Sequence, residues 1–301
     1  MTAHLNPESR HDFVLLFDVK DGNPNGDPDG GNLPRTDPET MQGLVTDVCL
    51  KRKVRNYIDI VYGEQENTKI YVQDKGVALN DMNARAYADL EIKSTGTKQK
   101  REEVNQARAW MCKNFYDIRM FGAVMSTKVN CGQVRGAIQL TFSRSIDPIM
   151  PLDVAITRVA ITDPKDAEVS VGSDGKAEGG KTSTIGRKAM IPYGLYQGHG
   201  FYSPHLAAQT GVTQEDLALF WEALIKMWDF DRSASRGMMA PRGLYIFSHE
   251  SKLGNAPAHK LFERVQVKLE KEGTVPRQFS DYEVIVNEAD LPTGVHLTKL
   301  I

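Results

Sequence analysis

One stretch near the N-terminus constrains the fold more than any other part of the chain. Residues 13–17 form an apolar run, residues 21–37 are rich in Gly, Asn, Pro and Asp, and residues 51–55 are mostly basic. A short apolar run that ends in Gly and Pro signals is typical of a buried strand. The stretch therefore predicts a strand, a long loop and a helix with a cationic face, which together would suit an anionic ligand.

The loop after this strand is long for a structureless connection, and such loops are usually functional. Its first half matches a calcium-binding pattern, but Asn32 stands where a bidentate Glu is required. We therefore interpret its Gly and Asn residues as positions for positive φ, which let a backbone approach a phosphate or a sugar closely. Its aspartates, among them Asp21 and Asp37, are better read as solvated turn formers than as metal ligands or acid–base groups.

Charge is distributed unevenly along the 301 residues, although the formal net charge is only −2. The first 40 residues hold three basic and eight acidic side chains, whereas residues 181–204 and 232–248 hold basic residues and no acid. Local basic tracks on a near-neutral chain favour a groove for a polyanion, with acidic surfaces that repel it or dock on another copy.

The cysteines and the lengths of the apolar runs indicate the cellular compartment in which the protein is expected. Three cysteines without a C-x-x-C pair indicate a reduced, intracellular protein without disulfides or a cysteine zinc site. The first residues are polar, and no apolar run approaches the roughly 20 residues of a membrane span. We therefore expect a cytoplasmic protein with no signal peptide and no membrane contact.

The hydrophobic patterns predict an α+β sandwich, in which two main helices back one sheet and insertions elaborate it. We expect one helix from Pro38 to about Tyr62, a polar helical lobe from Leu79 to Phe115, and a helix from a capping box at Thr213 to about Phe230. Strands are expected at residues 13–19, 131–146, 152–161, 244–248, 265–269 and 282–286, with an extended, aromatic-rich segment at 185–202.

The cations, the loop and the aromatic segment together favour single-stranded RNA as the ligand. Phosphates need cations, and splayed bases need flat or apolar surfaces on which to stack. The candidate RNA-binding residues are Arg35, Lys51, Arg52, Arg55, Arg119, Lys128, Arg135, Arg187, Lys188 and Arg236. Nucleotide-binding, hydrolase and metalloprotease motifs are absent, and the seven histidines lack metal spacing. We therefore expect no catalytic residue, no metal site and no cofactor.

Several segments, in order along the chain, closely resemble one known family. They are Asn23-Pro-Asn-Gly-Asp-Pro-Asp, Leu33-Pro-Arg-Thr-Asp, Thr46-Asp-Val-Cys-Leu-Lys-Arg-Lys-Val-Arg, Asp117-Ile-Arg-Met-Phe-Gly-Ala-Val, Gly132-Gln-Val-Arg-Gly-Ala-Ile-Gln-Leu and Arg236-Gly-Met-Met-Ala-Pro-Arg-Gly-Leu. The chain resembles the backbone subunit of the type I-C CRISPR Cascade complex, in the seventh CRISPR-associated protein family of the repeat-associated RNA-binding superfamily. The resemblance covers most of the chain and is weakest over residues 163–182.

The resemblance implies a fold and a division of the chain. The family has an RNA-recognition-motif-like (ferredoxin-like) palm with inserted helical fingers and a thumb. On this basis we expect palm segments at residues 1–63, 117–162 and 206–301, fingers at 64–116 and a thumb at 163–205. Within the thumb, Met190 and Ile191 are candidates for the apolar wedge at a displaced base, and a place in the core is an equal alternative for both.

The resemblance also implies a function. Copies of such a subunit polymerise as a helical filament along the crRNA spacer, thumbs displace bases at intervals, and the remaining bases pair with target DNA in an R-loop. Other Cascade subunits complete the complex, and a separately recruited helicase-nuclease cuts the DNA, so the subunit itself is expected to be no enzyme and to serve antiviral defence. The alternative is a metal-dependent endoribonuclease, because related type III subunits cleave RNA with an aspartate in the loop after the first strand, where this chain carries Asp21 and Asp37.

Overall fold

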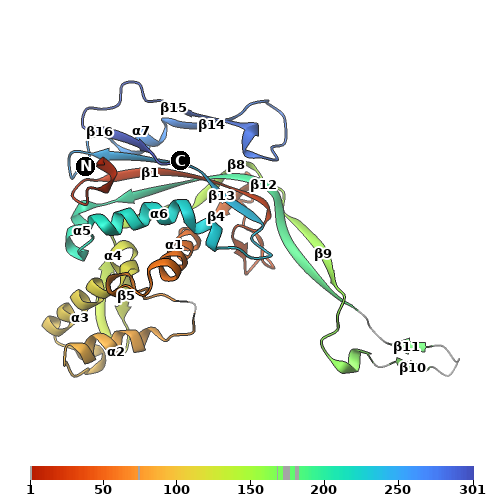
Figure 1. Cartoon of the computed structure of the whole chain (residues 1–301), viewed down its shortest axis with the longest axis horizontal. Coiled ribbons are helices and arrows are strands. Elements are labelled where there is room, and N and C mark those ends of the chain that lie inside the picture. The colour runs from red at the N-terminus through yellow and green to blue at the C-terminus, as the bar shows by residue number, and fades with distance from the viewer. Residues whose placement is uncertain (1, 74, 168, 172–176, 180–182) are drawn as a thin grey trace.

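An eight-stranded antiparallel sheet forms the centre of the molecule. The computed structural model describes residues 2–73, 75–167, 169–171, 177–179 and 183–301 (Figure 1). The strands run in the order β16-β13-β1-β12-β8-β4, and β7 and β9 also pair with β12. The bounds are β1 His11–Gly22, β4 Gln42–Val45, β7 Ile138–Leu140, β8 Ser143–Pro148, β9 Leu152–Arg158, β12 Thr184–Tyr202, β13 Met238–His249 and β16 Val295–Lys299. The predicted α+β class is confirmed, whereas β16 was not predicted.

Helices and small sheets surround this sheet. The helices are α1 Asp47–Tyr62, α2 Leu79–Asp89, α3 Arg101–Asn114, α4 Tyr116–Phe121, α5 Pro204–Thr210, α6 Gln214–Phe230 and α7 Ala258–Phe262. The two-stranded sheets are β2 Gly26–Asp27 with β3 Leu33–Pro34, β5 Gly122–Ser126 with β6 Asn130–Arg135, β10 Val169–Val171 with β11 Ala177–Gly179, and β14 Val265–Leu269 with β15 Tyr282–Val286. Helices α1 and α6 lie on one face of the central sheet, and α7, β14 and β15 lie on the other (Figure 1).

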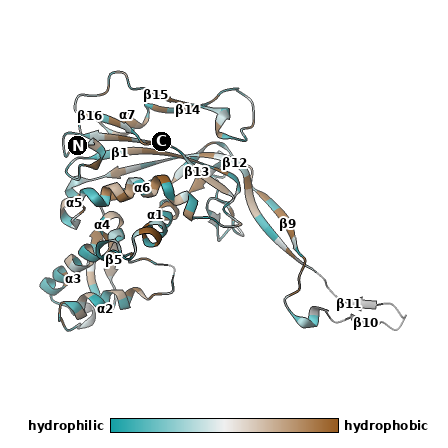
Figure 2. Cartoon of the chain, viewed as in Figure 1, coloured by the Kyte–Doolittle hydropathy of each residue, from teal (hydrophilic) through white to brown (hydrophobic). Residues whose placement is uncertain are grey.

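The middle of strand β1, residues 13–17, is apolar because both of its faces are buried (Figure 2). Phe13 and Phe17 face α6, where Phe17 stacks on Trp228 with ring centroids 4.8 Å apart. Val14 and Leu16 belong to a separate core on the opposite face of the sheet. Central strands covered on both faces read as near-continuous hydrophobic runs, which explains why residues 13–19 were predicted correctly.

Helix α1 begins at Asp47, so the predicted start at Pro38 is wrong. Thr46 caps the helix, with its Oγ1 accepting a hydrogen bond from the Cys49 N–H at 3.3 Å. Pro38 instead follows Asp37, whose carboxylate accepts from the N–H groups of Glu39 and Thr40 and so closes a turn. Strand β4 then separates this turn from the helix.

The single strand predicted over residues 131–146 is wrong as well, because three strands occupy that stretch. Strand β6 pairs with β5 inside the helical lobe, whereas β7 and β8 pair with β12 in the central sheet. The chain changes sheets at Gly136, where a Cβ would lie 2.2 Å from the carbonyl carbon of Phe121. The lobe of α2, α3, β5 and β6 has its own core, which includes Met125 and Cys131 and so extends past residue 116.

A long two-stranded ribbon leaves the central sheet (Figure 1). It consists of β9 and the first part of β12, paired from Arg158–Thr184 to Leu152–Met190. From Ile191 to Tyr202, β12 is a central strand paired with β1. We call β9 and residues 184–190 the ribbon. No helix in the described part of the chain is long and apolar enough to cross a membrane.

Candidate nucleic-acid interface

The loop between β1 and β4 is fixed to the start of α1. The Asn25 Oδ1 accepts hydrogen bonds from the backbone N–H of Thr46 at 3.0 Å and from its hydroxyl at 2.9 Å. The Cys49 thiol donates to the Pro24 carbonyl at 3.5 Å, and Arg236 Nη1 donates to the same carbonyl at 3.3 Å. Because these hydrogen bonds reach the helix cap and a residue 212 positions away, Arg236, the loop is fixed in place by tertiary contacts.

The point where this loop leaves β1 is constrained sterically. A Cβ at Gly22 would lie 1.9 Å from the Arg236 carbonyl oxygen, and one at Gly237 would lie 2.4 Å from the Asp21 carbonyl oxygen. Asp21 itself is exposed and has a φ of 50°, in the left-handed region that non-glycine residues adopt rarely. The close approach of these two backbones therefore demands glycine on both sides.

Two polar atoms in this loop region are buried and lack a hydrogen-bond partner among the described residues: Asn23 Oδ1 and Arg35 Nε. Asn23 donates from Nδ2 to the Asn32 carbonyl at 2.8 Å, and Arg35 Nη1 lies 3.3 Å from an Asp27 carboxylate oxygen. Unpaired buried polar atoms are uncommon in folded proteins, which makes this loop a natural place for a ligand or a bound water. Of the sequence candidates, Arg35 is the one that the loop itself presents.

The cations of α1 are largely engaged within the fold. Lys51 pairs with Asp47 at 2.8 Å, and Arg52 Nη1 donates to the Val72 carbonyl at 2.8 Å. Arg55 Nε pairs with buried Asp117 at 2.8 Å, and both Lys51 and Arg55 lie over the Phe121 ring. Each of the three side chains is only partly exposed. The predicted cationic face therefore exists, but its charges also hold the lobe against the helix.

Arg119, a candidate for RNA contact, is a core residue instead. Its side chain is 4% exposed, and it forms a bidentate pair with Asp216 through Nε at 3.0 Å and Nη2 at 2.7 Å. Its remaining donors reach the carbonyls of Asn67, Cys112 and Lys113. All five N–H groups of the guanidinium are used, so none is left for a phosphate. We remove Arg119 from the candidate interface for this reason.

The ribbon carries two of the candidate cations. Arg187 is 79% exposed and pairs with Asp153 on the facing strand at 2.7 Å, while Lys188 is half-buried and has no partner in the described part of the chain. Lys188 shares a face with Met190, Val154 and Leu152, because cross-strand partners project to the same side. Val154 is 40% exposed, so this face combines a cation with accessible apolar side chains.

The two wedge candidates have different environments. Met190 is the last ribbon residue of β12 and is half-buried. Ile191 pairs with Gly22 in the central sheet, is 0% exposed and belongs to the main core. Ile191 is therefore a core residue, which was the alternative stated for it, and Met190 alone is placed where a base could reach it.

The remaining candidates lie apart from the ribbon. Lys128 is exposed in the turn between β5 and β6, and Arg135 is exposed at the end of β6. Arg236 is 30% exposed and pairs with Asp231 at 3.2 Å besides its bonds to the loop. The structure thus brings Arg35, Arg236 and the start of α1 together around the loop, and leaves Arg135 on the helical lobe.

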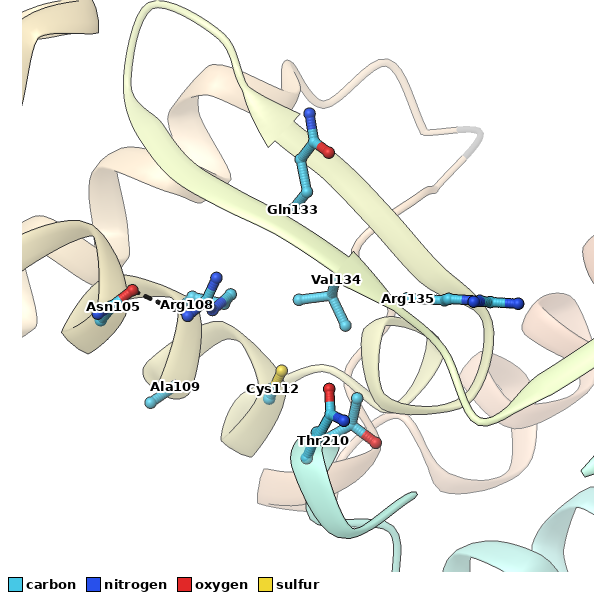
Figure 3. Close-up of a pocket in the computed structure, with 9 residues that line it drawn as sticks. Asn105, Arg108, Ala109, Cys112, Gln133, Val134, Arg135 and Thr210 are labelled. Atoms are coloured by element: carbon cyan, nitrogen blue, oxygen red, sulfur yellow. Dashed lines mark hydrogen bonds between the residues drawn. The ribbon is translucent and has the colours of Figure 1, made fainter. Parts of the chain in front are cut away.

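Sequence analysis missed two features. Arg242 Nε pairs at 2.8 Å with buried Asp18, which also accepts from the Tyr193 hydroxyl at 3.0 Å; burial raises the pKa of Asp18 although both contacts favour its charged form. The acid-free stretch 232–248 was the available signal for Arg242. The second feature is a groove of about 420 Å³ between α3, β6 and α5 (Figure 3). No local sequence pattern predicts it, because its lining comes from three separate elements.

One carboxylate of the loop, that of Asp37, is held by an arginine. Asp37 accepts from Arg144 Nη1 at 2.6 Å, and this contact lowers the pKa of its carboxyl group. Across the residues that the structure describes, no three His, Cys, Asp or Glu side chains lie close enough to hold a metal ion. What the arrangement offers is Arg35 and Arg236 beside the loop and a ribbon that carries cations and apolar side chains, which can hold phosphates and support bases.

Comparisons with known proteins show the family to which the chain belongs. Residues 9–287 match the model of the family described as CRISPR-associated protein Cas7. A protein of that name from Haloferax volcanii is 26% identical over 228 residues, which are 72% of this chain and 64% of the relative, so the chain covers less than two thirds of the relative's length.

Two solved chains are similar in structure. One is described as "CRISPR RNA-guided surveillance complex, pre-nicking", with a TM-score of 0.47, 15% identity and coverage of 79% of this chain and 78% of that chain. The other, "CRISPR RNA-guided surveillance complex", has a TM-score of 0.42, 14% identity and coverage of 79% and 68%. The assignment rests on the family match, which spans nearly the whole sequence. The chain belongs to the CRISPR-associated protein Cas7 family.

Proposed function

We propose that the protein is a non-catalytic, crRNA-binding backbone subunit of a type I-C CRISPR surveillance complex. Copies of it would polymerise along the spacer and present bases for pairing with target DNA in an R-loop during antiviral defence. Other Cascade subunits and a separately recruited helicase-nuclease would complete the system. Family membership supports the general role, and the loop, the α1 cap and the ribbon supply the chemistry that RNA needs.

The order of the elements supports an RNA-recognition-motif-like palm. Strand β1, helix α1, strands β8 and β12, helix α6 and strand β13 follow one another as β-α-β-β-α-β, with the sheet order β13-β1-β12-β8. This order is the one expected for a ferredoxin-like palm, and it supports the proposal. The lobe of α2, α3, β5 and β6 would be the fingers, and the ribbon with the segment beyond it would be the thumb.

The observation that carries the proposal is the ribbon. A two-stranded sheet is marginally stable in water when nothing covers it, yet six of the seven residues of β9 are exposed. Val154, Lys188 and Met190 lie on one face of the ribbon, and Arg187 lies on the other. Such a face fits a nucleic-acid strand, because the cations meet phosphates and the apolar side chains meet bases.

RNA binding by a ribbon variant tests this proposal. The double variant Arg187→Glu with Lys188→Glu should weaken binding to RNA of any sequence, and it should reduce the slope of log affinity against log salt by about 0.7 for each phosphate that the ribbon no longer neutralises. The matched control is Lys252→Glu with Lys260→Glu, which changes the net charge equally at exposed positions away from the ribbon. Equal RNA affinity and equal slope for both double variants would refute the assignment of the ribbon.

A metal-dependent endoribonuclease is the second candidate function, and one observation favours it. Asp21 is exposed, follows β1 in the loop and holds a strained left-handed φ, and strained residues cluster at functional sites. Incubation of the assembled protein with complementary RNA and Mg²⁺ separates the two candidates. Cleavage that disappears in Asp21→Ala or Asp37→Ala would establish the nuclease. RNA that stays intact with the unaltered protein would refute the nuclease function.

A further inference from the structure

The groove between the helical lobe and α5 is built to receive an anion. Its volume is about 420 Å³, and α3, β6 and α5 supply Arg108, Arg135, Gln133 and Gln209 to its lining (Figure 3). No Asp or Glu is among the residues that line it. The groove therefore offers a concave surface that is rich in hydrogen-bond donors and carries two positive charges.

These donors are free for a ligand. Arg135 and Gln209 are exposed, and in the described part of the chain neither side chain has a hydrogen bond or an ion pair. Arg108 forms one hydrogen bond, from Nη2 to the Asn105 Oδ1 at 2.8 Å, and keeps its other N–H groups. Two arginines at the base of this lobe pair with a carboxylate, Arg55 with Asp117 and Arg119 with Asp216, whereas Arg108 and Arg135 make no ion pair in the described part of the chain.

The same chain carries a matching acidic tip. Residues 21–39 hold five acids and one base. Asp27 pairs with Arg35, and Asp37 pairs with Arg144. Asp29 and Glu39 are exposed and make no side-chain ion pair among the residues described. Asp29 sits at the turn of the β2–β3 hairpin, where an added Cβ at Gly31 would meet nothing within 4 Å, and Glu39 sits in the turn between β3 and β4.

The tip and the groove lie at opposite ends of the molecule. His11, at the start of β1, pairs with Tyr202, just before α5 and the groove, whereas the acidic loop follows Gly22 at the end of β1. A strand of 12 residues spans about 40 Å. One copy cannot bring its own tip into its own groove, so the two surfaces can meet only between copies. A contact of this head-to-tail kind joins different surfaces of successive copies, and it generates a filament where the rotation between copies does not close a ring.

We propose that the Asp29 and Glu39 tip of one copy docks into the Arg108 and Arg135 groove of the next. The inference rests on the proposed function, because it supplies the contact that would set successive copies along the RNA. The groove continues into a neighbouring pocket through Cys112 and Thr210, and that pocket is lined by Glu215 and Asp216. A phosphate backbone that ran along the groove would be repelled by these carboxylates. An acidic loop of a second copy needs cations only at its own carboxylates, so we favour it as the occupant of the groove.

Reciprocal charge reversal tests the pairing. The groove variant combines Arg108→Glu with Arg135→Glu, and the tip variant combines Asp29→Lys with Glu39→Lys. Each alone should assemble on a long RNA at least ~100-fold less tightly than the unaltered protein, because like charges then face each other at every contact. An equal mixture should recover assembly, since the basic tip fits the acidic groove and the acidic tip fits the unaltered groove. Light scattering of RNA-bound species measures this, and recovery also shows that both variants are folded.

Other outcomes would overturn the pairing. Assembly of either variant at the unaltered affinity, or a mixture that stays as weak as its components, means that the tip and the groove do not meet. A groove variant that loses affinity for a short RNA loaded by a single copy would show that the groove binds nucleic acid instead.

A cross-link that needs no RNA separates this inference from the proposed function. Protein with Asp29→Cys, mixed with protein with Gln209→Cys and oxidised, should form a disulfide-linked dimer, whereas Lys252→Cys in place of Asp29→Cys should not. If the unaltered protein fails to bind RNA, the proposed function falls while the cross-link still reports on the contact. If RNA binding is intact and the cross-link equals the control, the docking inference falls alone.

Discussion

Replacement of Arg119 by Met isolates a structural cation from the RNA-binding ones. Arg119 links α4 to the first turn of α6 through Asp216, and it also binds three carbonyls at the base of the helical lobe. Met keeps a flexible apolar stem of similar length but removes the charge and all five donors. The change leaves the Asp216 carboxylate with its N-cap hydrogen bond from the Thr213 N–H and without its counter-ion.

The magnitude follows from the burial of the pair. Loss of one partner of a buried ion pair costs about 3–5 kcal/mol, because the other charge stays buried without compensation. Arg119 and Asp216 also line an open groove of about 720 Å³, so water can reach the orphaned carboxylate. We therefore expect a loss near the lower limit, ~3 kcal/mol. With a urea m-value of about 3 kcal/mol/M for a chain of this size, the unfolding midpoint should fall by ~1 M.

Urea unfolding followed by tryptophan fluorescence measures this loss, since Trp221 and Trp228 lie on α6. The salt dependence of RNA affinity is the second readout, and its slope should equal that of the unaltered protein. The double variant with Asp216→Asn should lose less stability than the sum of the single changes, because it removes both charges. A midpoint within ~0.3 M of the unaltered protein, together with a reduced salt slope, would refute the structural role and restore Arg119 to the RNA-binding set.

Three further predictions concern a buried histidine, two glycines and the two wedge candidates. Burial lowers the pKa of His11 to about 4, so the unfolded chain binds more protons than the folded one below pH 6.5. The free energy of unfolding should therefore be highest above pH 6.5 and should fall by ~3 kcal/mol towards pH 4. Urea unfolding of His11→Gln at a series of pH values should lack this fall. Gly22→Ala places a Cβ against the Arg236 carbonyl and should lower the thermal midpoint, whereas Gly31→Ala, which meets nothing within 4 Å, should have a much smaller effect even though its positive φ disfavours alanine. Ile191→Ala should cost ~2–5 kcal/mol in urea unfolding, while Met190→Ala should cost far less and instead change RNA binding.

Sequence patterns predicted correctly the elements whose hydrophobic pattern and capping residues match the burial seen in the structure. Residues 13–19 read as a strand because both faces of β1 are covered, and Thr213 read as a helix start because its capping box is present. The start of α1 was predicted wrongly because Pro38 and Thr46 both carry N-terminal signals, and only the pairing of β4 with β8 decides between them. Likewise, nothing local to residues 131–146 shows that Gly136 must pass against the backbone of Phe121.

The site was harder to predict than the fold, because a cation does not show in the sequence whether it has a partner. Arg119 pairs with Asp216, Arg55 with Asp117 and Lys53 with Asp231, and these partners lie 62 to 178 residues apart in the chain. Charge counts over short windows treat all these cations as free. Exposed cations such as Lys128, Arg135 and Arg187 share the sequence pattern of the buried ones, so only tertiary structure separates the two sets.

This division decides how variants of α1 must be interpreted. Arg55 pairs with Asp117, whose carboxylate also accepts from the N–H groups of Tyr71 and Val72, so Arg55→Gln weakens the junction between α1 and the lobe. We expect Arg55→Gln to lower RNA affinity through a displaced lobe, with the salt slope unchanged and stability reduced, because breaking one side of a buried pair leaves Asp117 uncompensated. Removal of a cation that binds a phosphate directly would instead reduce the slope by about 0.7 with stability preserved. Salt titration combined with urea unfolding of Arg55→Gln therefore distinguishes a helix that holds the RNA from a helix that holds the lobe.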